Sequence, residues 1–186
     1  MSTKGTKKSY TRNNIPQKNF EKFKEILLYI LSKAENLAGI GETKLYKFLY
    51  FIDFNFYEKY ERQLVGATYL KNKFGPTPNE FYKWANIMIM AGELKKEQRV
   101  LKDYNNRKQN TYIALRKPDL KKLEPKEIEI IDNVLSKLSH MNARAISNYS
   151  HGDVPYLAAE DGHIIEYESV FYRMAPYSVR ECDEHV

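Results

Sequence analysis

Ser150, His151 and Asp153 are the residue types of a hydrolase catalytic triad, and they lie close together in the sequence. In a triad the three side chains converge from different elements, whereas near neighbours in a sequence mostly point apart. The chain also has no Gly-x-Ser-x-Gly elbow that would expose a nucleophile. We therefore expect no enzymatic activity and rank an enzyme using these residues behind two binding functions. Our interpretation is a turn in which Asp153 accepts hydrogen bonds from backbone amides ahead of Pro155.

The patterns of metal and cofactor sites are missing as well. The four histidines are His140, His151, His163 and His185. They show no paired ligand spacing on a helix, and the single cysteine, Cys182, excludes a cluster of thiolate ligands. The Gly39-Ile40-Gly41 segment lacks the lysine and the preceding strand of a phosphate-binding loop. We expect no metal and no cofactor.

The composition is typical of a soluble intracellular protein. One cysteine in 186 residues rules out a disulfide framework and fits a reducing cytoplasm. No apolar run is long enough to span a bilayer, and the N-terminus lacks the apolar core of a signal peptide. We therefore predict a cytoplasmic protein with no membrane partner. The chain length suits one domain with a sizeable core.

One stretch, residues 44–60, must organise the domain. Placed on a helix at about 100° per residue, its large side chains form two adjacent apolar stripes. The first stripe consists of Leu45, Phe48, Leu49, Ile52, Phe56 and Tyr60, and the second of Tyr46, Tyr50, Phe54 and Tyr57. Leaving such side chains in water would cost roughly 1.5–3 kcal/mol each. The stretch is therefore predicted to be a central helix that is covered on several sides.

Asp53 lies between the two apolar stripes of this helix. A carboxylate in that position needs a cation or a hydrogen-bond donor, or a functional reason to be there. One interpretation is structural: Asp53 caps or pairs with another element, with His151 or a backbone amide of the 150–155 turn as the partner. The other is contact with a partner protein. The sequence leaves both open.

The segments around the central helix predict further elements. Apolar spacing indicates an amphipathic helix over 20–38, and a strand is expected over 64–71. The next helix is expected over 78–91, with Thr77 as its N-cap, Pro78 as its first residue and Glu80 completing a capping box.

The second half of the chain predicts a hairpin over 99–115 with a polar loop, a helix that begins at Pro125 and a shorter helix over 142–149. We predict an α+β fold: a mostly helical single domain with a small antiparallel sheet formed from the 65–73 segment and the 99–115 hairpin.

The formal charge of +6 is concentrated at the N-terminus. Residues 1–20 contain no acid and five basic residues, Lys4, Lys7, Lys8, Arg12 and Lys18. The remainder is close to neutral, because its 25 basic residues (30 minus 5) face 24 acids. We expect residues 1–18 to be a disordered tail, which is either a solvated leader or an arm that contacts nucleic acid weakly.

The order of the predicted elements is loosely that of a winged helix, whose recognition helix is basic. Here the 78–91 helix has Lys83 as its only cation. That composition argues against sequence-specific DNA reading. A DNA-binding regulator that uses the tail and the hairpin tip, Arg107 and Lys108, remains the alternative function.

Several sequence blocks point to one family through their order. They are Lys47-Phe48-Leu49-Tyr50-Phe51, Gly66-Ala67-Thr68-Tyr69, Gly75-Pro76-Thr77-Pro78, Ser150-His151-Gly152-Asp153-Val154-Pro155, Ala158-Ala159-Glu160-Asp161-Gly162 and Phe171-Tyr172-Arg173. Over about 44–177, this succession resembles the Panacea domain of SocA-like antitoxins. Two residues depart from the family pattern: Tyr156 stands where a tryptophan is expected, and Ile52 replaces a usually smaller residue.

The resemblance implies an antitoxin of a two-gene toxin–antitoxin system of bacteria or their phages. It implies that the protein neutralises a cognate toxin by direct binding, and it places a Panacea-like domain over 19–180. The family occurs with many unrelated toxins, so the resemblance does not name the toxin.

Candidate contact residues follow from two considerations. Rigid turns beside aromatic residues lower the ordering cost of binding, which favours Tyr69, Phe74, Pro76, Pro78 and Tyr82. The remaining candidates are motif or central-helix residues, Tyr50, Asp53, His151 and Asp153. The alternative for the turn residues is that they only cap and pack the third helix.

Overall fold

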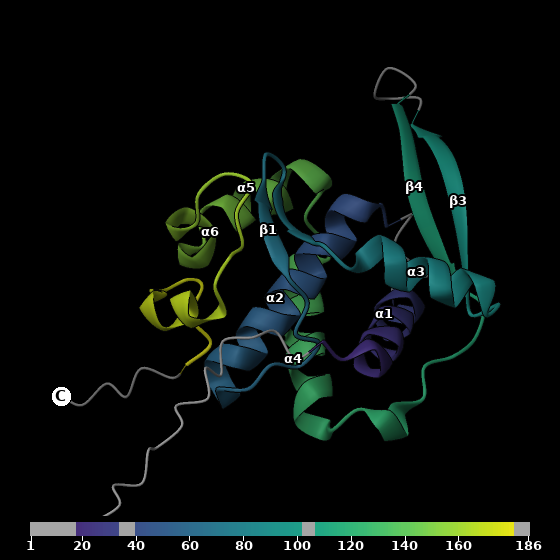
Figure 1. The fold of residues 1–186 in the computed structure, drawn as a ribbon, viewed down its shortest axis with the longest axis horizontal. Coiled ribbons are helices and arrows are strands. Elements are labelled where there is room, and N and C mark those ends of the chain that lie inside the picture. Colours follow the sequence, from purple (N-terminus) through teal and green to yellow (C-terminus); the bar gives the residue numbers. More distant parts are fainter. Residues whose placement is uncertain (1–17, 34–39, 102–106, 181–186) are drawn as a thin grey trace, which may run out of the picture.

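The computed structural model describes residues 18–33, 40–101 and 107–180 (Figure 1). The helices are α1 (Phe20–Lys33), α2 (Glu42–Tyr60), α3 (Phe81–Met90), α4 (Pro125–Leu138), α5 (Ala143–His151) and α6 (Val154–Ala158), with 3-10 helices η1 (Leu120–Lys122) and η2 (Tyr167–Tyr172). The strands are β1 (Tyr69–Asn72), β2 (Gly75–Pro78), β3 (Leu94–Leu101) and β4 (Arg107–Ala114). The α+β prediction of a mostly helical single domain with antiparallel hairpins is confirmed.

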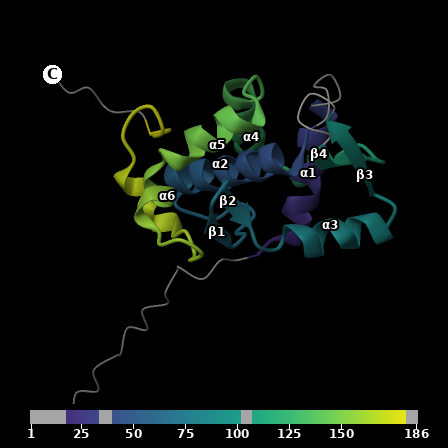
Figure 2. The same ribbon diagram turned by 90° about the horizontal axis from the view of Figure 1, so that it is seen from above.

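Helix α2 is the centre of the fold, as predicted. Figures 1 and 2 show it running through the middle of the molecule, with α4 and α5 on one side and the β1–β2 hairpin on the other. Both of its apolar stripes are buried apart from the terminal Tyr60, which is half-buried. Phe51, outside the two stripes, is also covered, and its ring lies 5.3 Å from that of Tyr149.

The strands form two separate two-stranded sheets. Strands β1 and β2 pair antiparallel from Tyr69–Pro78 to Asn72–Gly75, and β3 pairs with β4 from Leu94–Ala114 to Leu101–Arg107. The prediction of one sheet built from 65–73 and the 99–115 hairpin is therefore wrong. The physical reason is that the chain turns back directly after Asn72, so the segment that follows supplies the pairing partner of β1.

The residues predicted to start the third helix belong to β2 instead. Gly75 has φ +96°, a left-handed conformation that glycine adopts without strain, and it closes the turn after β1. The Thr77 hydroxyl donates to the Gly75 carbonyl oxygen (3.3 Å) rather than capping a helix. Helix α3 consequently begins at Phe81, with Glu80 as its N-cap residue. The Glu80 carboxylate accepts a hydrogen bond from the Thr68 amide (2.8 Å).

Two further boundaries bear on the site. The helix predicted from Pro125 is confirmed as α4, with a reciprocal capping box between Glu124 and Glu127. The turn expected over 150–155 is shorter than predicted, because α5 extends to His151 and α6 begins at Val154. Residues 1–17 of the predicted tail, the end of the first predicted helix beyond Lys33 and residues 102–106 of the hairpin loop lie outside the described residues.

Candidate functional site

Asp53 is completely buried in the middle of α2, where it holds the loop that follows this helix. Its Oδ1 accepts hydrogen bonds from the amides of Val65 (2.7 Å) and Gly66 (3.3 Å), and its Oδ2 accepts one from Ala67 (3.4 Å). The loop can wrap around the carboxylate because Gly66 has φ +67°. The backbone amides of Gly66 and Ala67 therefore bind an acid of the preceding helix.

Two tyrosine hydroxyls complete the surroundings of Asp53. Tyr69 of β1 donates to Oδ2 at 3.2 Å, and Tyr167 of η2 donates to the same oxygen at 2.9 Å. The Tyr167 ring is stacked on Phe54 with centroids 4.4 Å apart. Burial raises the pKa of Asp53 above its ordinary value, and the hydrogen bonds from Val65 and Tyr167 oppose that shift.

The interpretation of Asp53 as an acid that pairs with another element agrees with this geometry. The predicted partner is wrong, because neither His151 nor an amide of the 150–155 turn is among the donors. The carboxylate points toward the loop after α2 and not toward α5.

The second buried cluster is built on the guanidinium of Arg173, which follows η2. Its Nε lies 2.8 Å from Asp153 Oδ1 and its Nη2 lies 2.5 Å from Oδ2, while Nη1 donates to Glu58 Oε2 and Asn55 Oδ1, both at 2.9 Å. The Tyr50 hydroxyl donates to Asp153 Oδ2 (2.8 Å). One cation therefore joins the α5–α6 junction to two acceptors on α2.

Burial alone would lower the pKa of Arg173, but the adjacent Asp153 carboxylate outweighs it and holds the guanidinium charged. Burial raises the pKa of Tyr50 well above its ordinary value, so its hydroxyl stays a donor. The interpretation of Asp153 as an acceptor of amides ahead of Pro155 is wrong. Its carboxylate instead binds a cation twenty residues further along the chain.

A third cluster surrounds Lys47, whose side chain is buried although it is a lysine. Its Nζ donates to the Pro76 carbonyl oxygen at 2.9 Å. Among the described residues, no carboxylate lies within ion-pair distance of this nitrogen. Burial consequently lowers the pKa of Lys47 to about 7.

Gly75 completes the packing around Lys47. A Cβ atom on this glycine would lie 2.4 Å from Ser150 Oγ and 2.6 Å from Lys47 Cε. The turn between β1 and β2 therefore sits directly on α2 and α5, and only a residue without a side chain fits there.

Ser150, His151 and Asp153 face separate environments. The Ser150 hydroxyl donates to the Ser147 carbonyl oxygen (2.7 Å), and Asp153 binds Arg173. The His151 ring stacks on Tyr156 at 4.8 Å, and its Nε2 is buried without a hydrogen-bond partner among the described residues. Burial lowers the pKa of His151, and the charges of two nearby lysines add to that effect. No hydrogen bond between the described residues joins the three into a triad.

The predicted contact residues divide into buried and exposed ones. Of the five predicted contact residues at the turns, Tyr69, Pro76 and Pro78 are buried. Only Phe74 and Tyr82 are exposed at the surface. Phe74 is 61% exposed at the β1–β2 turn, and Tyr82 is 49% exposed on α3.

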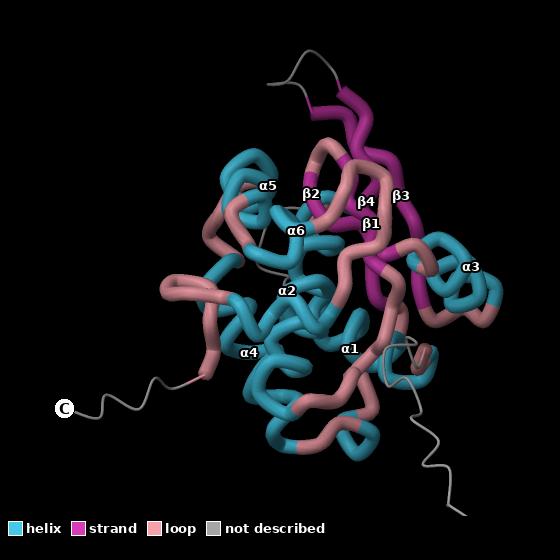
Figure 3. The backbone as a smooth tube through the Cα atoms, turned by 60° about the vertical axis from the view of Figure 1, so that its left-hand side comes forward, coloured by secondary structure: helices cyan, strands magenta, loops and turns pink. Residues whose placement is uncertain are grey.

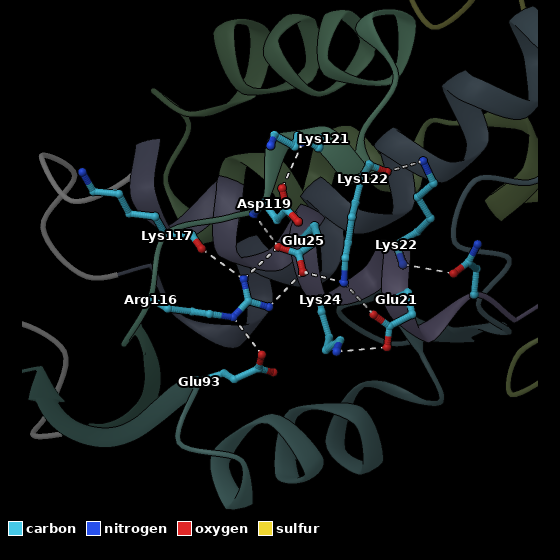
Figure 4. A network of polar contacts seen from close by, with 11 residues as sticks. Glu21, Lys22, Lys24, Glu25, Glu93, Arg116, Lys117, Asp119, Lys121 and Lys122 are labelled. Atoms are coloured by element: carbon cyan, nitrogen blue, oxygen red, sulfur yellow. Dashed lines mark hydrogen bonds and ion pairs between the residues drawn. The ribbon is translucent and has the colours of Figure 1, made fainter.

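A further buried acid, outside the sequence blocks, connects α1 to the segment after β4. Glu25 of α1 binds Arg116 through two hydrogen bonds (2.8 and 2.9 Å) and accepts the Asp119 amide at 2.7 Å, as Figure 4 shows. Burial opposes ionisation of Glu25, but Arg116 holds the pKa of this carboxyl below its ordinary value. These contacts tie the segment after β4 to α1.

Sequence reasoning missed Lys47, Glu58, Tyr167 and Arg173 as parts of the polar interior. At helical spacing, Lys47 and Glu58 fall on the narrow polar face that the two apolar stripes leave on the central helix. The available signal was the narrowness of that face: polar residues on a helix covered on most sides are themselves covered. Arg173 stands at the end of a sequence block, but its partner could not be read from spacing.

The described residues contain no group of three or more histidine, cysteine, aspartate or glutamate side chains arranged to hold a metal ion. Within the same residues, no helix has the length and apolar character needed to cross a membrane. The family model described as "Antitoxin SocA-like, Panacea domain" matches residues 45–155. No curated protein and no solved structure matches the chain.

Proposed function

Because the chain belongs to the family of SocA-like antitoxins with a Panacea domain, we propose that it neutralises a cognate toxin by direct protein–protein binding. In this proposal the protein acts without catalysis, in the cytoplasm of a bacterium and as part of a bacterial or phage toxin–antitoxin system. The toxin is the partner whose identity the experiment below is designed to reveal.

One observation carries this proposal beyond the family match. The blocks that characterise the domain supply Lys47, Tyr50, Asp153 and Arg173, and these side chains are buried and hydrogen-bonded within the chain. Side chains engaged in this way stabilise a scaffold, because their polar atoms serve contacts within the chain. A scaffold that is held internally leaves its surface to recognise the partner, which is the property a binding protein needs.

Tyr82 is the contact residue that we favour on this surface. Its hydroxyl donates to Glu42 Oε2 (3.0 Å), and the Lys96 ammonium lies 5.5 Å from the centre of its ring. A tyrosine whose orientation is already held loses little entropy on binding, and exposed tyrosines are frequent anchors of interfaces. Ile87 and Met90, which are 41% and 89% exposed on the same helix, extend the surface with apolar area.

Phe74 is a second exposed anchor, at the β1–β2 turn. The Ser147 hydroxyl donates to its backbone carbonyl oxygen (3.0 Å), which ties the turn to α5. Its ring is presented by a short, pinned hairpin, so contact with a toxin there would also carry a small ordering cost.

The experiment is co-expression with each small reading frame adjacent to the gene of this protein. We expect one neighbour to stop growth alone and growth to return when the full chain is co-expressed. The purified pair should then form a complex in titration calorimetry. Rescue without a complex would contradict direct binding, and neighbours that are all harmless would contradict the antitoxin assignment.

A further inference from the structure

The β3–β4 hairpin extends away from the rest of the molecule, as Figures 1 and 3 show. We refer to its two strands, 94–101 and 107–114, as the basic ribbon. Its inner end is anchored: Tyr112 donates to Glu42 Oε1 (2.8 Å), and its ring packs against Phe81 at 5.3 Å. Asn110 also donates to Glu42 Oε1 (3.1 Å). Beyond this point Gln98, Arg99, Val100 and Lys108 are exposed.

The ribbon is strongly basic. Its cations are Lys95, Lys96, Arg99, Arg107 and Lys108. Its only acid is Glu97, so the two strands carry a net charge of +4, five cations minus one acid. Glu97 is bound to its neighbour Lys95 at 2.9 Å, which lowers the pKa of this carboxyl, and the charge of Arg99 adds to that effect.

The cations are distributed over both faces of the ribbon. Successive residues of a strand point to opposite faces, and residues paired across the two strands share a face. Lys96 therefore shares one face with Lys108, which pairs with Val100, whereas Lys95 and Arg99 lie on the other. A ribbon with positive charge on both faces is matched by a groove that has negative charge on both walls.

We propose that the basic ribbon binds double-stranded DNA by entering the major groove. That groove is about 12 Å wide and admits a two-stranded ribbon, and phosphates line both of its sides. Arg99 and Lys108 would contact phosphates on opposite walls. Gln98, exposed on the same face as Lys108, is of a residue type that pairs with base edges.

The composition of the ribbon favours a nucleic acid over an acidic protein. Protein interfaces are built on aromatic and apolar anchors and are depleted in lysine. In the described outer part of the ribbon, Val100 is the only exposed large hydrophobic side chain. The groove favours DNA over double-stranded RNA, because the A-form major groove is too deep and narrow for side chains to read.

The test uses the full chain and a fluorescently labelled DNA duplex of about 20 base pairs, with affinity measured by anisotropy between about 50 and 200 mM salt. The variant Arg99→Gln/Lys108→Gln removes one cation from each face. The slope of log affinity against log salt is negative, and each lost phosphate contact makes it shallower by about 0.9. We therefore expect its magnitude to decrease by about 1.8 in this variant.

The matched control is Lys117→Gln/Lys121→Gln, which removes the same charge from two exposed lysines near η1. In Figure 1 this segment lies at the opposite end of the molecule from the outer ribbon. The control should keep the wild-type slope, and both variants should keep the wild-type melting temperature. The N-terminal residues are the same in all three proteins, so any binding by them cancels.

An equal salt slope in the ribbon variant and the control would overturn the proposal, as would an absence of binding by the wild type. Equal affinity for an RNA duplex, lost in the same variant, would overturn the major-groove assignment. Growth rescue by Arg99→Gln/Lys108→Gln separates this inference from the toxin-binding function. We expect rescue to be unchanged, because the toxin contact that we favour lies on α3.

Discussion

Arg173 and Asp153 form a two-point ion pair in the interior of the protein, with Nε–Oδ1 and Nη2–Oδ2 distances of 2.8 and 2.5 Å. Both side chains are fully shielded from solvent. Charges in such surroundings are stabilised only by one another and by their hydrogen bonds. The pair therefore connects the end of η2 to the α5–α6 junction. Losing either residue leaves the charge of the other buried without its partner.

Replacing Arg173 with methionine should lower the free energy of unfolding by about 3–5 kcal/mol, because Asp153 and Glu58 would be left buried without their cation. Urea unfolding followed by circular dichroism measures this. The matched control is Arg62→Met, which breaks an ion pair with Glu124 whose side chains are 50% and 45% exposed. It should cost at most about 1 kcal/mol. Similar losses of unfolding free energy in both variants would show that the buried ion pair stabilises the protein no more than an exposed one.

Asp53→Ala should lower the free energy of unfolding by about 1–3 kcal/mol, since it removes the acceptor of buried amides and hydroxyls after α2. The measurement is a thermal or urea unfolding curve, with Asp161→Ala, at a 94% exposed side chain, as the control. If Asp53→Ala melts like the wild type but no longer neutralises the toxin, the carboxylate serves the interface and the structural role is wrong.

Lys47 should make the stability of the protein depend on pH. Its pKa is about 7 in the folded state and 10.5 when it is unperturbed. Between these values the unfolded chain binds one more proton, so stability rises with pH over this window. Lys47 should raise the free energy of unfolding by about 1.4 kcal/mol for each pH unit in this window. The stability gained in this way is lost again as pH falls toward 7.

Comparison with Lys47→Met isolates this effect, because the other titrating groups are common to both proteins. Urea unfolding at several pH values from 7 to about 9.5 should give wild-type stabilities that climb relative to the variant. Below about pH 7 the difference should be constant. Parallel stability curves across the whole window would mean that Lys47 remains charged in the folded protein.

Gly75→Ala should destabilise the protein by more than Gly92→Ala does. Both glycines have positive φ, +96° and +70°, so both substitutions introduce backbone strain, which is about 1–2 kcal/mol for a left-handed residue. At Gly75 the new methyl group would also meet Ser150 Oγ at 2.4 Å, whereas nothing lies within 4 Å at Gly92. Urea unfolding compares the two, and equal losses would mean that the contact with Ser150 relaxes freely.

Tyr82→Ala should weaken toxin binding by at least about thirtyfold, the loss typical of an interface anchor worth 2 kcal/mol. Titration calorimetry with the purified toxin measures this, and Lys83→Glu tests the adjacent position by charge reversal. The control is Tyr172→Ala, which removes a tyrosine that is 76% exposed on η2. If the Tyr82 and Lys83 variants bind and rescue growth as the wild type does, the toxin contacts another surface.

The sequence by itself determined those features that depend on local periodicity. The apolar residues of 44–60 cover so much of a helical circumference that only a central position satisfies them. The capping box at Glu124 and Glu127 and the start of α4 at Pro125 follow from contacts within a few residues. The ordered blocks also identified the family, which the match over 45–155 confirms.

Strand pairing overrode the local preference of individual residues. Thr77 and Pro78 suit the start of a helix by local preference, but β1 offers residues 75–78 a complete hydrogen-bonding partner. Pairing with a neighbouring strand outweighs a cap, which contributes only about 1 kcal/mol.

The partners of the buried charges were decided by the tertiary structure alone. Asp53 and Asp153 were recognised as acids that need donors, yet Tyr167 reaches Asp53 from 114 residues away and Arg173 reaches Asp153 from the end of another element. Periodicity describes which face of a helix is covered but not which side chain covers it. A buried charge takes its donor from whatever packs against it, and that choice exists only once the elements are assembled.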